Sequence, residues 1–283
     1  GSAAPRAISL GASQGPSVVA LSDAEFHGLK AESLTVGSNQ TTAIVVEHIK
    51  AAPPAATVVQ LMTLTTARSP GTVTFQGQSS TFTALTVLAA GDLVHGSHLS
   101  TTLGDLTLEA SSITVSDGVR MNANGSMAIR GASGGGVGNV SLQGSANIRS
   151  GGRFTLQSHL VGASDFSLKT GDVAISADLT LNAGTLHLQP DSMFQSVTLG
   201  EPSNATGGSS YRIEDAELAR VSAPMTLIGS GSGAGITIGG LTAAATSKLG
   251  RLHMVGGSNA GLLFHSTPTK VAVPVSFAGG GAL

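Results

Sequence analysis

The sequence predicts an all-β fold, a right-handed parallel β-helix (β-solenoid) with about 20 residues per coil. Three observations predict it: an unusual composition, a recurring apolar triplet, and a regular spacing between triplets. The chain contains 39 glycines. Of its residues, 41% are hydrophobic, 11% are charged and 3% are aromatic. Globular domains carry about 25% charged residues. The chain can therefore bury a core of small aliphatic side chains under a surface of Ser, Thr, Asn and Gly.

The apolar triplets are clearest between residues 104 and 200. In each, two apolar residues flank a middle residue that is most often Thr or Ser. The two-residue period of a β-strand places both apolar side chains on one face. The triplets that show this pattern are 106–108, 113–115, 119–121, 127–129, 140–142, 154–156, 166–168, 173–175, 179–181, 186–188 and 197–199.

Successive triplets between residues 154 and 186 begin six to seven residues apart, so three of them make a turn of about 19 to 21 residues. A hairpin meander would need longer strands and Asn-Gly or Asp-Gly turns at each reversal. Small polar residues separate the triplets instead, which is typical of bends between the faces of a three-sided coil. Residues 131–138, rich in glycine, interrupt the period and are predicted to form a loop at one corner.

We expect residues 3–283 to form a single elongated solenoid, an internal fragment of a larger repetitive protein, preceded by an expression scar at residues 1–2. A longer repeat relates residues 24–64 to residues 216–254. Glu25 and Glu217, and Ile44 and Ile236, are each 192 positions apart. Ordered matches at one offset favour a duplication.

Residues 34–38 (LTVGS), 104–108 (GDLTL) and 236–243 (ITIGGLTA) resemble the repeats of filamentous-haemagglutinin-type and autotransporter-type surface adhesins. The resemblance lies in composition and periodicity and covers most of residues 30–270. It implies a right-handed β-helix that is extracellular or at the cell surface and serves in adhesion or as a stalk. Its partners would be glycans or surface proteins of a host, matrix or neighbouring cell, and flanking β-solenoid repeats of the same chain.

The remaining composition narrows the partners and cofactors. The net charge of −2 leaves no electrostatic footprint for nucleic acid, and no apolar run reaches the 18 residues of a membrane span. The chain has no cysteine, which excludes disulfides and thiolate metal sites. We expect no cofactor, no catalytic residue, no cofactor-binding residue and no metal site, and we expect that the chain is not an enzyme.

The alternative is a carbohydrate-binding or carbohydrate-active β-helix protein, whose enzymes bring two or three carboxylates together. Asp23, Glu25 and His27 alternate along what we interpret as a strand, so they are candidate metal ligands. A solvent-facing strand is the favoured interpretation. The charged residues between Arg212 and Arg220 are interpreted as a solvated turn. His95 and His98 have a chelating spacing but no third ligand nearby.

Two surface patterns complete the predictions. Asn39, Asn124, Asn139 and Asn204 begin Asn-x-Ser/Thr sequons, which a eukaryotic secretory host would glycosylate. The segments 63–65, 72–74 and 81–83 are Thr-x-Thr units nine residues apart. If coils here had about 18 residues, Thr63 and Thr81 would stack, as in an ice-binding solenoid, which is a minor alternative function.

Overall fold

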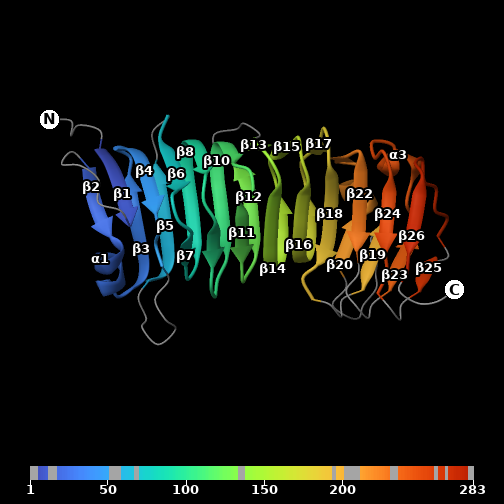
Figure 1. The fold of residues 1–283 in the computed structure, drawn as a ribbon, viewed down its shortest axis with the longest axis horizontal. Helices are drawn as coiled ribbons and strands as arrows, with labels where there is room; N and C mark the ends of the chain where they lie inside the picture. Colours follow the sequence, from blue (N-terminus) through green and yellow to red (C-terminus); the bar gives the residue numbers. More distant parts are fainter. Residues whose placement is uncertain are drawn as a thin grey trace.

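The computed structural model is a rod of stacked strands, with the first and last of its described strands at opposite ends (Figure 1). It describes residues 6–11, 18–50, 59–66, 70–132, 138–192, 196–200, 211–229, 235–257, 261–264 and 267–279. Every strand pairing that is assigned a register is parallel, and one sheet of 22 strands winds along most of the rod. The predicted all-β parallel β-helix is therefore confirmed.

The strands fall on three faces, which we call A, B and C. Face A stacks β3 (Ala31–Ser38), β5 (Val59–Thr66), the first parts of β8 (Leu85–His95) and β10 (Leu106–Val115), β12 (Met127–Gly131), and the second parts of β14 (Ala146–Leu156) and β16 (Phe166–Ile175). Beyond β16, face A is continued by a separate four-stranded sheet, whose first strand contacts β16. Its strands, in order, are β20 (Tyr211–Glu214), β19 (Val197–Gly200), β23 (Ile236–Gly239) and β25 (Leu262–Phe264).

Face B stacks β2 (Val18–Ser22), β1 (Arg6–Gly11), β4 (Thr41–Glu47), β6 (Thr72–Gln76), the second parts of β8 and β10, β13 (Asn139–Leu142), β15 (His159–Gly162), β17 (Leu179–Leu181) and β21 (Val221–Ser222). Face C stacks β7 (Ser80–Phe82), β9 (Leu99–Thr101), β11 (Arg120–Ala123), the first parts of β14 and β16, β18 (Thr185–Pro190), β22 (Met225–Gly229), β24 (Leu252–Val255) and β26 (Val275–Ala278).

The alternation of apolar and polar residues positions the core. In β16, Phe166, Leu168, Val173 and Ile175 point inward and are buried, and they stack on the inward residues of the neighbouring coils. One continuous hydrophobic cluster, mostly aliphatic, runs from Leu10 to Met254. Burying apolar area contributes roughly 25 cal/mol per Å², so each added coil extends the core that stabilises the next.

The stacking predicted for the threonine units is wrong. Thr63 lies on face A opposite Thr86, Thr74 lies on face B, and Thr81 lies on face C opposite Ser100. Nine residues carry the chain from one face to the next and not through half a coil. The three units therefore belong to three sides of a single coil.

Three short helices lie at corners: α1 (Asp23–Gly28), α2 (Asp215–Leu218) and α3 (Ala243–Thr246). The first two belong to segments with the same arrangement. β1 lies between β2 and β4 in the stack. In the same way, β19 lies between β20 and β23, which are the strands 192 positions after β2 and β4. The chain thus steps back by one level in the stack just before each helix.

The hydrogen bonds around α1 and α2 also correspond. Asp23 Oδ1 accepts a hydrogen bond from the Lys50 backbone N–H at 3.0 Å, and Asp215 Oδ1 accepts one from Thr242 at 2.8 Å. Both helices begin with a capping box, closed by Glu25 in α1 and by the acid 192 positions later in α2. The two segments therefore share strand order, helix and corner bonds.

Candidate functional site

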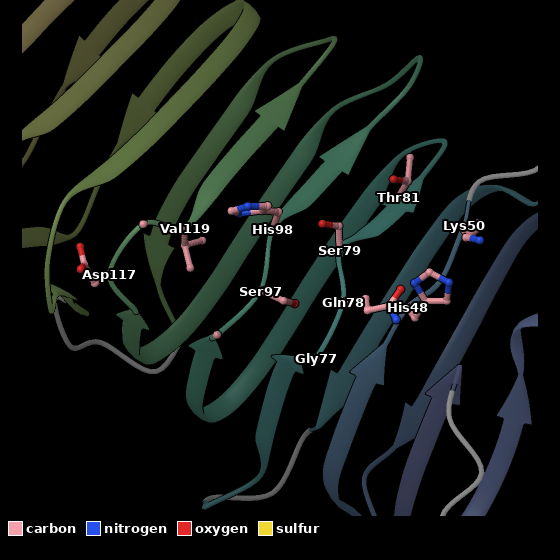
Figure 2. A pocket seen from close by; sticks show the side chains of 12 residues that line it. His48, Lys50, Gly77, Gln78, Ser79, Thr81, Ser97, His98, Asp117 and Val119 are labelled. Carbon is pink, nitrogen blue, oxygen red and sulfur yellow. The ribbon is translucent and has the colours of Figure 1, made fainter.

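The candidate site is a groove along the corner where face B turns into face C, which we call the corner groove (Figure 2). It has a volume of about 650 Å³ and crosses four successive coils. The segments that follow β4, β6, β8 and β10 form its wall. It is lined by His48, Lys50, Gly77, Gln78, Ser79, Thr81, Gly96, Ser97, His98, Asp117, Gly118 and Val119.

His48 carries backbone strain in this groove. Its φ is 55°, and among the residues that the structure describes it is the sole non-glycine residue with positive φ. The position 192 residues later is Gly240, with φ 67°, where the same backbone turn carries no side-chain penalty. Strain of this kind persists where the surroundings impose it and is concentrated at functional sites. A histidine side chain is thus held at a turn that glycine would form more easily.

The polar groups of the groove differ in whether they already have partners. His98 Nδ1 accepts a hydrogen bond from the Arg120 backbone N–H at 3.1 Å, so neutral His98 carries its proton on Nε2. Asp117 Oδ1 accepts one from the Ser145 backbone N–H at 2.8 Å. Ser97 Oγ, on a residue only 6% exposed, has no hydrogen-bond partner, and neither does the buried Nδ1 of His48.

This arrangement can donate and accept hydrogen bonds to a ligand with several hydroxyl groups. Lys50 adds one exposed cation at the groove wall. Asp117 is the single carboxylate among the lining residues and already binds the next coil. Glycoside hydrolysis generally uses a pair of carboxylates. The lining residues therefore fit binding better than hydrolysis.

The three candidate metal ligands lie on α1 and not on a strand, so the alternation by which we expected them on one face is wrong. On a helix, Asp23 and His27 are one turn apart, and Asp23 Oδ2 lies 3.6 Å from His27 Nδ1. Glu25 instead reaches back to Ser22, whose backbone N–H and hydroxyl both donate to it. These hydrogen bonds lower the pKa of Glu25. Within the described ranges no three His, Cys, Asp or Glu side chains gather as metal ligands.

The charged residues between Arg212 and Arg220 lie at a junction between coils. Glu217 accepts hydrogen bonds from the backbone N–H of Ile175, in the preceding coil, and of Glu214. Burial nevertheless raises the pKa of Glu217, and the charges of Glu214 and Asp172 add to the rise. Arg220 donates to the Ile175 carbonyl at 3.2 Å. We interpreted this segment as a solvated turn, but it fastens α2 to the coil that contains β16.

Other acids also fasten neighbouring coils. Carboxylate oxygens of Asp105 and Asp165 accept hydrogen bonds from backbone N–H groups of the next coil at 2.8 and 2.7 Å. Arg153 pairs with Asp172, and Arg149 with Asp191, each at less than 3 Å. The Asp191 carboxylate raises the pKa of Arg149. These acids stabilise the stack and do not converge on one surface.

His95 and His98 do not act together. His95 is fully buried in the core, whereas His98 is exposed in the corner groove. The chelating spacing in the sequence does not bring the two rings together, because β8 extends to His95 and directs its side chain inward. The two side chains therefore cannot chelate one ion.

Of the four sequons, the structure places Asn39, Asn124 and Asn139 at exposed positions. Asn204 lies outside the described residues, as does the middle of the glycine-rich loop, residues 133–137. No helix in the described part of the chain has the length and apolar character to cross a membrane. Comparisons with protein-family models, curated proteins and solved structures found no match.

Proposed function

We propose that this chain is a structural and adhesive segment of a large secreted or cell-surface β-helical protein. The observation that carries the proposal is that aspartate side chains at the corners accept hydrogen bonds from backbone N–H groups of neighbouring coils. A rod held together in this way transmits load and sets a distance. The recurrence of one strand order at both α1 and α2 supports a length built by duplication.

A panel of polysaccharides incubated with the chain tests the structural role. We expect no release of reducing ends and no unsaturated product. Release that disappears in an Asp117→Asn variant would overturn the proposal in favour of a carbohydrate-active enzyme. The Asp92→Asn variant is the matched control, because Asp92 is exposed and lies outside the groove.

The corner groove favours a second candidate function, carbohydrate binding. Most of its lining residues have polar side chains, and Ser97 Oγ, which has no partner, offers a hydrogen bond to a hydroxylated ligand. A glycan array probed with the chain is the test. We expect bound glycans to be lost in Lys50→Ala and Gln78→Ala variants and retained in Lys169→Ala, whose exposed side chain lies on face C. Equal binding by all three variants would exclude the groove.

A further inference from the structure

The amino-terminal end of the rod and the junction at α2 have corresponding surfaces with different burial. At the junction, Tyr211, Ile213 and Ile228 are each 0% exposed. The residues 192 positions earlier are Val19, Leu21 and Val36. Val19 is 51% exposed, and the other two are only partly buried. The same backbone positions are thus covered in one copy and open in the other.

The covering element at the junction is the coil formed by the end of β16, β17 and β18. β20 and α2 contact β16, β21 pairs with β17, and β22 pairs with β18. The coil is held by side chains as well, because the Ile175 backbone N–H donates to Glu217 Oε1 at 3.0 Å. The outer edges of β20, β21 and β22 therefore constitute a socket for one coil.

The amino-terminal copy presents the same socket. In the described residues, β2 pairs with β1 alone and β3 pairs with β5 alone, so each has an outer edge without a ladder partner. Glu25 is exposed, with its Oε2 bound to Ser22 as Glu217 Oε2 is bound to Glu214. We call this the end surface; its residues are Val19, Leu21, Glu25, Leu29, Leu34 and Val36.

We propose that the end surface binds the last coil of another parallel β-helix segment, in the way that β20, α2, β21 and β22 bind the coil of residues 172–190. The inference rests on the proposed function, because it assumes a rod assembled from repeated lengths. The partner coil carries inward apolar side chains at the positions of Val173, Leu179 and Leu186. It also offers a free backbone N–H, at the Ile175 position, to Glu25 Oε1.

A second copy of this chain does not supply that coil. Its residues 172–190 are already paired with its own β21 and β22 and lie against its own β20. Its carboxyl end, β25 and β26, corresponds instead to the earlier strands β6 and β8, since β25 pairs with β23 as β6 pairs with β4, and β26 pairs with β24 as β8 pairs with β5. The partner is therefore a distinct length of solenoid.

Tandem chains test the proposal. In one, residues 85–210 are joined to Val19, so that β19 replaces β1; in the other, residues 85–196 are joined to Ile8, which keeps β1. Both continue to residue 283. We expect backbone amides of residues 19–22 and 34–37 to exchange at least about tenfold more slowly in the tandem chains than in the 283-residue chain. Exchange at the single-chain rate in both tandems would overturn the proposal, as would a first segment that stays unfolded with either junction.

The matched control is Leu34→Lys. We expect the single chain to keep its fold with lysine at this partly exposed position, whereas in a tandem the buried charge should remove the slowed exchange. Slowed exchange that survives the lysine would count against docking. Sedimentation of the single chain, combined with its amide exchange rates, tests whether a second copy is the partner. A dimer in which the amides of residues 19–22 exchange slowly would overturn the choice of a distinct segment. Polysaccharide cleavage would overturn the proposed function without altering these exchange rates.

Discussion

Phe75 and His95 stack face to face in the core, with ring centroids 4.9 Å apart and ring planes 5° apart. They occupy opposite register positions on β6 and β8, and the next coil places Val115 against His95. Neither ring nitrogen of His95 has a hydrogen-bond partner. Burial therefore favours the neutral imidazole and lowers the pKa of His95 to about 4.

This burial makes the stability of the rod depend on pH. A folded-state pKa below the unfolded value of 6.5 means that the unfolded chain binds the proton first as the pH falls. The stability associated with neutral His95 is fully present above pH 6.5 and falls progressively as the pH drops, with about 3 kcal/mol lost by about pH 4. Urea denaturation of the parent and of His95→Leu between pH 7 and pH 4 measures it.

The leucine variant isolates the histidine, because all carboxylates titrate alike in both proteins. We expect His95→Leu to be at least as stable as the parent at pH 7 and to lose less stability on acidification. Parallel pH curves for the two proteins would contradict a buried, neutral His95.

Corner carboxylates provide a second prediction. Replacing Asp105 or Asp165 by alanine leaves a backbone N–H of the next coil, at Ser126 or Thr185, without its acceptor. We expect each variant to lose about 0.5 to 1.5 kcal/mol of unfolding free energy, because water can reach the freed N–H. Asp92→Ala removes the same charge from an equally exposed position, where no hydrogen bond to a described residue is lost, and should change stability by less than about 0.5 kcal/mol. Equal losses in all three would show that net charge is responsible.

Glycines at strand ends provide a third. Gly200 has φ +102°, and a Cβ there would collide with the Gly239 carbonyl oxygen of the adjacent strand. Gly118 has φ +70° with open space around it. Alanine at Gly118 meets only the left-handed backbone penalty of about 1 to 2 kcal/mol, whereas alanine at Gly200 also forces the strands apart. Thermal unfolding should therefore show a much larger loss for Gly200→Ala.

The triplets predicted the strands because inward residues such as Leu106 and Leu108 must alternate to fill a narrow core. They did not predict α1, since Asp23, Glu25 and His27 alternate in the sequence as strand residues would. A local signal was present: Ser22 followed three residues later by Glu25 is a capping box, which marks a helix start.

The corner groove lay beyond sequence reasoning. It depends on how the corners of four coils align and on the positive φ of His48, neither of which a residue pattern specifies. The predicted stacking of the threonine units was wrong for a related reason. Register follows from which residues face inward, and a spacing of nine residues leads to the adjacent face of the same coil.

The last prediction compares the two corresponding strands β2 and β20. Ile213 of β20 is fully buried under the preceding coil, while Leu21 of β2 is partly exposed. Truncating a buried aliphatic residue to alanine costs about 2 to 5 kcal/mol, because the cavity that remains is not filled. We expect Ile213→Ala to fall in that range and Leu21→Ala to cost clearly less, as measured by urea denaturation of each variant. A Leu21→Ala loss as large as that of Ile213→Ala would mean that the amino-terminal strand is already packed as the internal one is.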